Sequence, residues 1–254
     1  LTLTLTLTLT LTLTLTLTIK ATAIILAAGS GSRMQGAVAD KTLAPLNGLP
    51  VLCHSIRAFL ESGCIDRFTI VHRDDAQKTA LTDALSQIDL QGTPIDWALG
   101  GNERQDSVYN ALRIQPDTST HVFIHDSARP LVPIESIQAL HAAAIRNRAA
   151  VLAHPVADTI KRIPTAGKLE QTELEDLDRS RLWAMETPQA FALPDILRAY
   201  QHVHESGLRI TDDTAAAATI GLHTTIVPNH TPNLKITTPH DLDYAAWLLT
   251  HEHR

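Results

Sequence analysis

Residues 23–34 read Ala-Ile-Ile-Leu-Ala-Ala-Gly-Ser-Gly-Ser-Arg-Met, and this stretch decides the class of fold. Its apolar beginning is typical of a parallel strand that is covered on both faces. Gly29 and Gly31 permit a tight turn in which a ligand can approach the backbone closely. The unpaired N–H groups of such a turn favour an anion, and Arg33 and Lys41 add positive charge nearby in the sequence. The stretch therefore predicts a strand followed by a phosphate-binding loop.

Two common phosphate-binding motifs do not fit this loop. The dinucleotide fingerprint needs a third glycine where Met34 stands, and an acidic residue where residues 71–73 read Val-His-Arg. A P-loop has glycine directly before its Lys-Thr pair, whereas Asp40 precedes Lys41 here. The pattern that remains, A-A-G-x-G-x-R-M with a lysine shortly after it, resembles the loop of nucleotidyltransferases that activate sugar phosphates.

The rest of the chain alternates short apolar runs with helical patterns. The expected strands are residues 23–26, 68–71, 95–98, 121–124 and 150–153. The expected helices are residues 51–61, 76–86, 106–114, 134–145, 194–204 and 212–219. This alternation predicts an α/β, Rossmann-like fold, with a mostly parallel sheet and helices on both faces. Ligands bind beyond the carboxyl ends of such strands, where Gly29, Gly100 and Asp126 fall.

Further motifs make the resemblance more specific. They are G-G-N-E-R-Q-D-S-V at 100–108, H-D-S-A-R-P at 125–130, P-V-A-D-T-I-K at 155–161, D-R-S-R-L-W at 178–183, T-P-Q at 187–189, T-D-D at 211–213 and N-L-K-I-T at 233–237. In this order they are similar to the motifs of the 2-C-methyl-D-erythritol 4-phosphate cytidylyltransferase family of isoprenoid biosynthesis. The resemblance covers most of the chain beyond the first 18 residues.

The resemblance implies a reaction and a cofactor. The cytidylyl group of CTP would pass to 2-C-methyl-D-erythritol 4-phosphate with release of pyrophosphate, and Mg²⁺ would assist. Fixed cations suffice for such a transfer, because the attacking phosphate is already ionised and no covalent intermediate is required. Two alternatives stay open: a ribitol 5-phosphate cytidylyltransferase, which shares the nucleotide motifs, and a nucleotide-binding module without turnover.

Site roles follow from the same motifs. The catalytic residues would be Arg33, Lys41, Arg179 and Lys235. The nucleotide would be bound by Ala27, Ala28, Gly29, Gly31, Gly100, Gly101, Asn102 and Ser107. The acceptor would be bound by Asp126, Arg129 and Thr159, and Asp126 is also the candidate metal ligand, with CTP supplying most of the metal's other ligands. Arg104 is expected to fix its own loop through backbone hydrogen bonds.

The loop lysine departs from the family pattern. The family usually has Pro-Lys-Gln, but residues 40–42 read Asp-Lys-Thr, and the spacing from Arg33 is slightly longer than usual. Asp40 could partly neutralise Lys41. Because a flexible loop absorbs a small change of length, Lys41 is still expected to be a ligand. Asn102 also stands where the family usually has an acid.

Residues 158–183 interrupt the alternation with a charge-rich run that is too long for a simple loop in a compact domain. The resemblance implies a β-arm that reaches across a two-fold axis into the partner subunit of a homodimer. Residues 19–254 would then form a single nucleotidyltransferase domain, with this segment as its dimerisation arm. Arg179 and Thr159 would contribute to the neighbouring subunit's site.

The composition of the chain limits the kinds of partner and the cellular location that we expect. The net charge of −6 argues against broad nucleic-acid binding, which needs a basic face. No apolar run approaches the length of a membrane span. Cys53 falls in an expected helix and Cys64 just after it, so a disulfide between them is not expected and a reducing, cytoplasmic location fits. Residues 1–18 are nine Leu-Thr dipeptides, read as a low-complexity extension without a role in the site.

Overall fold

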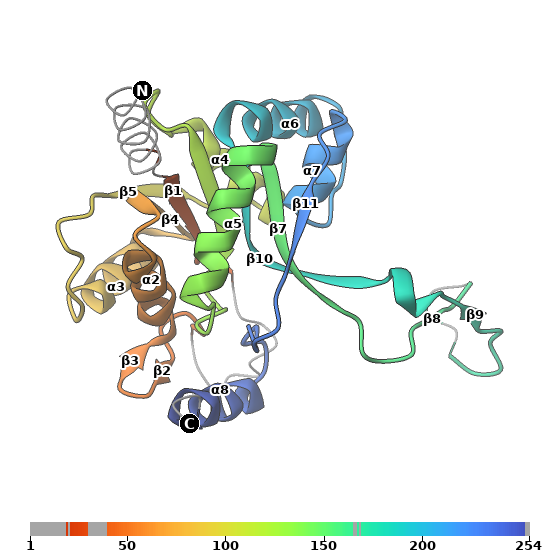
Figure 1. The fold of residues 1–254 in the computed structure, drawn as a ribbon. Coiled ribbons are helices and arrows are strands. Elements are labelled where there is room, and N and C mark those ends of the chain that lie inside the picture. Colours follow the sequence, from red (N-terminus) through yellow and green to blue (C-terminus); the bar gives the residue numbers. More distant parts are fainter. Residues whose placement is uncertain (1–18, 20, 30–39, 165–166, 168, 252–254) are drawn as a thin grey trace, which may run out of the picture.

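The computed structural model describes residues 19, 21–29, 40–164, 167 and 169–251 (Figure 1). Within these residues a seven-stranded sheet has the order β11-β7-β10-β6-β1-β4-β5. Its strands are β1 (Ala21–Leu26), β4 (Ile65–His72), β5 (Ile95–Leu99), β6 (His121–Asp126), β7 (Ala149–Pro155), β10 (Trp183–Ala192) and β11 (Thr225–Pro228). Only β10 runs antiparallel to its neighbours β6 and β7, and the other pairs in this sheet are parallel. The predicted mostly parallel α/β sheet is confirmed.

Helices cover both faces of this sheet (Figure 1). Their bounds are α2 (Val51–Ser62), α3 (Asp75–Leu85), α4 (Arg104–Arg113), α5 (Ile134–Asn147), α6 (Leu193–Glu205), α7 (Asp213–Thr219) and α8 (Pro239–His251). Side chains of β1 alternate between the two faces, as the pleat of a strand requires. Ile25 packs in the core beneath α2 and α5, whereas Ile24 packs in the core with α4, α6 and α7. Both faces of β1 are therefore buried, which explains its continuous apolar sequence.

The five expected strands and six expected helices are all present, but β10, β11 and α8 were not expected. Pro188 lies inside β10, and proline in a run normally argues against a central strand. The strand tolerates it because the register with β7 shifts between Met185 and Gln189. β11 has four residues and lies at the sheet's edge, too short for a clear pattern.

A small third core joins the C-terminal helix to the segment after Lys41. The hairpin of β2 (Pro45–Leu46) and β3 (Leu49–Pro50) places Leu46 against Ile236 and Leu248. This core ties α8, and the chain that leads into it, to the sheet. It thereby holds the segment after Lys41 and the end of the described chain close together.

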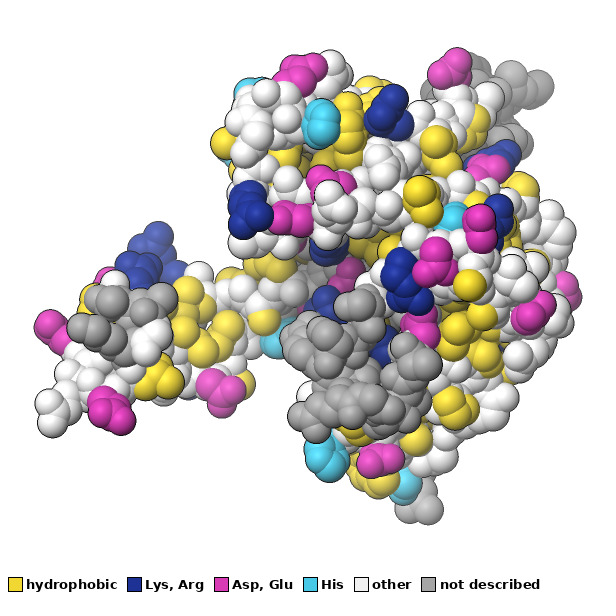
Figure 2. All heavy atoms as spheres, turned by 180° about the vertical axis from the view of Figure 1, so that it is seen from behind, with side chains coloured by type: hydrophobic (Ala, Val, Ile, Leu, Met, Phe, Trp, Pro, Cys, Tyr) yellow, Lys and Arg dark blue, Asp and Glu magenta, His cyan; other side chains and the backbone are white. Residues whose placement is uncertain are grey.

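The segment after β7 leaves the body as an arm, defined here as residues 156–182. It contains the two-stranded pair β8 (Lys161–Arg162) and β9 (Glu175–Asp176) and the short 3₁₀ helix η2 (Arg179–Arg181). Figure 2 shows that the arm stands clear of the body and carries apolar as well as charged side chains. The arm begins and ends slightly earlier in the chain than expected from the sequence, and it ends at residue 182 because Trp183 already pairs with Pro155 in the sheet.

The two cysteines lie where the sequence analysis expected them. Cys53 lies in α2 and Cys64 follows it, no disulfide joins the two, and both are buried. Burial raises the pKa of Cys53 to about 11, so this thiol is protonated near neutral pH. In the described part of the chain, no helix is both long enough and apolar enough to cross a membrane. The Leu-Thr tract lies outside the described residues.

Candidate active site

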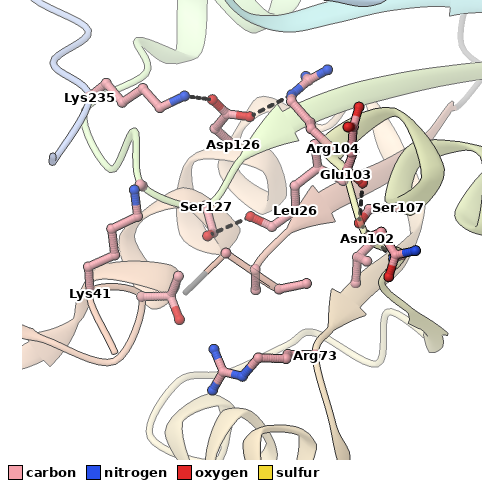
Figure 3. A pocket seen from close by; sticks show the side chains of 17 residues that line it. Leu26, Lys41, Arg73, Asn102, Glu103, Arg104, Ser107, Asp126, Ser127 and Lys235 are labelled. Carbon is pink, nitrogen blue, oxygen red and sulfur yellow. Dashed lines mark hydrogen bonds and ion pairs between the residues drawn. The ribbon is translucent and has the colours of Figure 1, made fainter. Parts of the chain in front are cut away.

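A cavity of about 540 Å³ opens at the carboxyl ends of β1, β4, β5 and β6 (Figure 3). Its volume is within the range of sites that bind small molecules. Residues from six separate segments of the described chain line it, and four of these segments follow parallel strands that end at this edge. The described part of the expected nucleotide loop thus lies close to Asp126, one of the expected acceptor residues.

The end of β1 forms the floor of this cavity. Ala27, Ala28 and Gly29 line it, as expected for nucleotide-binding residues. The strand end is held on both sides, since Ala27 N–H donates to Val71 O at 3.0 Å and Ser127 Oγ donates to Leu26 O at 2.8 Å. Gly31 and Arg33, also expected in the site, lie outside the described residues.

The Gly100-Gly101 pair is glycine for a steric reason. A Cβ on Gly101 would lie 2.2 Å from the Cβ of Asp106, and one on Gly100 would lie 2.7 Å from the Cβ of Ala28. Helix α4 and β1 therefore approach the loop as closely as its backbone allows. Gly101 lines the cavity, whereas Gly100 lies behind it and donates its N–H to His72 O at 2.7 Å.

Ser107 and Asn102 also line the cavity. The Ser107 hydroxyl accepts the Gly101 N–H at 3.0 Å and donates to Glu103 O at 3.2 Å. It thus holds the glycine loop in shape at the wall of the site. The sequence predicted Ser107 only as a nucleotide contact, so its bracing of the loop is a new finding.

Four cationic side chains line the cavity, namely Lys41, Arg73, Arg104 and Lys235 (Figure 3). Lys41 and Lys235 come from the same side, and Lys41 Nζ donates to Ile236 O at 3.2 Å. Arg73 lies on another wall, just beyond β4. The sequence analysis mentioned Arg73 only because residues 71–73 lack the acidic residue of a dinucleotide fingerprint. Its position directly after a buried strand was the signal that could have indicated a site residue.

Asp126 lies between two cations in the same cavity. Its carboxylate accepts from Lys235 Nζ and pairs with Arg104 Nε at 3.4 Å. Burial opposes ionisation, but the charges of Arg104 and Lys235 outweigh burial and hold the pKa of Asp126 well below its usual range. The carboxylate is therefore ionised at neutral pH, and both cations are aimed toward the centre of the site.

The expected role of Arg104 was wrong. Instead of backbone hydrogen bonds, its guanidinium makes a bidentate ion pair with Asp213, at 2.9 and 2.8 Å, besides its pair with Asp126. Asp213 is fully buried and also accepts from the Tyr200 hydroxyl. Arg104, which also lines the cavity, therefore links α4, α7 and β6, and no local pattern in the sequence indicated Asp213 as its partner.

Arg129 is not among the residues that line the cavity. Its guanidinium donates to Asn233 O at 2.7 Å, and burial lowers its pKa. Asn233 is held from the other side by Glu186, whose carboxylate accepts its Nδ2–H at 2.8 Å. Both residues brace the segment that carries Lys235. Glu186 was not singled out by the sequence analysis, because it stands between the motifs at 178–183 and 187–189 and belongs to neither.

The two expected arm residues lie apart from this chain's cavity. Thr159 and Arg179 are exposed, and neither is among the cavity-lining residues. Arg179 Nη1 donates to the carbonyl of Ala157 within the arm, at 2.9 Å. The structure of one chain thus brings Lys41, Lys235 and Asp126 together with the nucleotide loop but leaves Arg179 and Thr159 outside.

The cavity's acidic groups suit a metal that arrives with its ligand. Within the residues that the structure describes, no three His, Cys, Asp or Glu side chains cluster to hold a metal ion. The carboxylates that line the cavity are Glu103 and Asp126. Mg²⁺ is commonly bound through one or two carboxylates together with substrate phosphates, and this donor set fits that mode.

The cavity at the sheet's carboxyl edge is thus surrounded by a glycine-rich backbone loop, lysines from two distant segments and one ionised carboxylate. Such cavities bind phosphates through backbone N–H groups and fixed cations. Together with the mostly parallel sheet, this arrangement defines a site of the nucleotidyltransferase class.

The comparisons with known proteins specify the family. The family model for 2-C-methyl-D-erythritol 4-phosphate cytidylyltransferase matches residues 21–251. The enzyme of that name from Synechococcus elongatus is 40% identical over 227 residues, which cover 89% of this chain and 94% of the relative. The one from Symbiobacterium thermophilum is 38% identical over 230 residues, covering 91% and 93%.

Solved structures agree. The 4-diphosphocytidyl-2C-methyl-D-erythritol synthase from Anaerococcus prevotii superposes with a TM-score of 0.77 at 26% identity, covering 91% of this chain and 96% of that one. The chain therefore belongs to the 2-C-methyl-D-erythritol 4-phosphate cytidylyltransferase family and is a nucleotidyltransferase that transfers cytidylyl groups. The resemblance stated from the motifs is confirmed.

Proposed function

We propose that this chain transfers the cytidylyl group of CTP to 2-C-methyl-D-erythritol 4-phosphate in the cavity of Figure 3. The observation that carries this proposal is the match of residues 21–251 to the family, together with the convergence of Lys41, Lys235 and Asp126 on the glycine loop. An oxygen of the acceptor phosphate forms a bond to the α-phosphorus of CTP. The bond from that phosphorus to the β-phosphate oxygen breaks, and pyrophosphate leaves with the electron pair.

The barrier to this reaction is the approach of two polyanions. Lys41 and Lys235 reduce it, because they supply positive charge from one side of the cavity while charge grows on the α-phosphate and the leaving group. Arg33 of the loop is proposed to act with Lys41. The acceptor phosphate is ionised near neutral pH, so the reaction needs no general base.

The glycine loop is proposed to bind the base and ribose. The backbone of Gly101 and Asn102, shaped by Ser107, presents polar groups at the cavity wall beside Ala28. Polar groups placed for one base edge lose their partners with another base, which disfavours the wrong nucleotide. On the opposite side, Asp126 and the segment braced by Arg129 would hold the acceptor.

Mg²⁺ would be carried mainly by the triphosphate, with Asp126 as the candidate protein ligand. When bound, the ion would neutralise charge on the phosphates and on the departing pyrophosphate. Asp126 is ionised and lies at the carboxyl end of β6, so this chain holds the carboxylate ready for such a role.

The arm is proposed to complete the site of a partner subunit in a homodimer. Ile160, Leu169 and Leu174 on the arm are 40%, 78% and 54% exposed, which is unfavourable unless another surface covers them. Arg179 and Thr159 are also exposed and lie apart from their own cavity. An arm exchanged across a two-fold axis would bury the apolar side chains and bring Arg179 to the partner's acceptor site.

An assay of pyrophosphate release tests the reaction. With Mg²⁺ and 2-C-methyl-D-erythritol 4-phosphate, CTP should support turnover far better than UTP, ATP or GTP. Ribitol 5-phosphate should be a poor acceptor in the same assay. Equal turnover with UTP would contradict cytidylyl transfer, and a preference for ribitol 5-phosphate would move the chain to the alternative acceptor. Absence of pyrophosphate release with tight CTP binding would indicate a silent nucleotide-binding module.

Mixed dimers test the exchanged arm. Arg179→Ala and Lys41→Ala homodimers should each be nearly inactive, because each removes one half of every site. Co-refolding equal amounts should restore roughly a quarter of wild-type activity, since about half of the dimers are mixed and each mixed dimer has one intact site of two. If verified mixed dimers stay inactive, Arg179 serves its own chain's site and the exchange is wrong.

A further inference from the structure

The acidic residue before the catalytic lysine is buried rather than directed at solvent. Asp40 is 9% exposed. Its Oδ1 accepts from Thr42 N–H at 2.9 Å and from Thr42 Oγ1 at 2.8 Å. Its Oδ2 accepts from Gln77 Nε2 at 2.5 Å and lies 3.7 Å from Arg73 Nη2. A buried carboxylate is costly unless donors surround it, and each oxygen of this one has them.

Gln77 extends this contact to the floor of the active site. Its Nε2 also donates to Ala27 O at 2.9 Å, and its Oε1 accepts the Arg73 N–H at 2.6 Å. Gln77 lies in the first turn of α3, where Asp74 caps the helix by accepting the Gln77 N–H at 2.7 Å. Asp40 is thereby fastened to the end of β1 and to the beginning of α3, which are rigid parts of the fold.

The contact fixes the backbone on both sides of Lys41. Asp40 and Thr42 are its chain neighbours, and Leu52 N–H donates to Thr42 O at 2.9 Å. The ammonium group of Lys41 donates to Ile236 O, next to Lys235 on the same side of the cavity. Because both neighbours are held, the direction in which the lysine leaves the backbone is set before a nucleotide binds.

We propose that Asp40 is a positioning residue for Lys41: its carboxylate, held by Thr42 and Gln77, orients the lysine toward the nucleotide phosphates. This inference rests on the proposed cytidylyl transfer. It replaces the sequence-based interpretation in which Asp40 partly neutralises Lys41, because the carboxylate is engaged by Thr42, Gln77 and Arg73.

The two interpretations predict opposite results for Asp40→Ala. If Asp40 neutralises Lys41, its removal should strengthen the lysine's charge, lower KM for CTP and leave kcat unchanged or higher. If Asp40 positions Lys41, its removal should lower kcat about tenfold or more, since small displacements of a catalytic group are costly. Asp40→Asn should also lower kcat. The amide group of asparagine has only one oxygen, so its NH2 group would face a hydrogen-bond donor, either Thr42 or Gln77, and one of the hydrogen bonds would be lost.

The deciding experiment is a double-mutant cycle in kcat with Lys41→Ala. Asp40→Ala should lower kcat about tenfold in the wild-type enzyme, but by less than about twofold when Lys41 is already alanine, because a residue that acts through another loses its effect with it. Equal losses in both backgrounds, or no loss in the wild-type background, would overturn the proposal. A general loss of stability predicts equal losses, so the cycle separates it from positioning.

Asp195→Asn is the matched control for the loss of a largely buried carboxylate outside the active site. Asp195 has an 11% exposed side chain and pairs with Arg148 at 2.6 Å, and neither residue lines the cavity. This variant should lower the melting temperature while kcat stays within about twofold. Circular dichroism at the assay temperature confirms that each variant is folded. If the wild-type chain itself releases no pyrophosphate, the proposed function is wrong. If the wild-type chain is active but the double-mutant cycle shows equal losses, only the positioning role of Asp40 is wrong.

Discussion

Replacing Lys41 by alanine is expected to lower kcat by roughly a hundredfold, about 3 kcal/mol of transition-state stabilisation. The lysine lines the cavity next to the segment that carries Lys235, and we propose that its charge acts on phosphates whose charge grows during the transfer. Steady-state measurement of kcat and of KM for CTP checks this. The loss should appear mainly in kcat, because the interaction is strongest in the transition state.

Lys78→Ala is the matched control, since this lysine lies over the Trp97 ring at 5.6 Å and does not line the cavity. Its kcat should stay within about twofold of the wild-type value, a difference of roughly 0.4 kcal/mol. If Lys41→Ala raised KM for CTP and left kcat unchanged, Lys41 would bind the ground state and the transition state equally. The stabilising role proposed for it would then be wrong.

Replacing Arg104 by alanine is expected to destabilise the fold by about 3–5 kcal/mol, which is typical of leaving one partner of a buried ion pair without its counter-charge. Asp213 has no exposed surface, and without Arg104 its carboxylate would keep the Tyr200 hydroxyl but lose both guanidinium bonds. The melting temperature should fall by roughly 10 °C in a domain of this size. Thermal unfolding followed by circular dichroism measures the shift.

The matched control is Arg67→Ala. Arg67 pairs with Asp96 at 2.8 Å, and its side chain is about as exposed as that of Arg104, 30% against 32%. Asp96 is 40% exposed, whereas Asp213 has no exposed surface, so the loss of Arg67 should cost no more than about 1 kcal/mol. If Arg104→Ala shifted the melting temperature no more than Arg67→Ala does, the Arg104–Asp213 pair would not stabilise the fold. Arg104→Lys should fall between the two, since it keeps the charge but cannot bond both Asp213 oxygens.

Much of the fold was predictable from local patterns. Residues 23–26 fall within β1 and residues 134–145 fall within α5, because a covered strand and an amphipathic helix each leave a pattern in neighbouring residues. β10 left no such pattern, since Pro188 interrupts it and its place is decided by β6 and β7 on either side. The arm was visible only as a long charged interruption, and its extension away from the body needed the three-dimensional structure.

The candidate site divides in the same way. Short motifs, whose residue types indicate the kind of chemistry, contain the loop at Gly29, the Gly100-Gly101 pair and Lys235. The motifs did not predict which other residues surround each of these. Asp40 could be read as neutralising Lys41, and only the contact with Gln77, 37 residues away in the chain, showed where its carboxylate is directed.

By itself, therefore, the sequence predicted most of the strands and helices and identified the family, because each depends on residues that are close together in the chain. The tertiary structure alone decided which charges meet. Arg104 and Asp213 are 109 residues apart, as are Asp126 and Lys235. They come together because strands that are distant in the chain end at one edge of the sheet. A carboxylate that is buried at this edge is stable in its ionised form only when an opposite charge lies beside it.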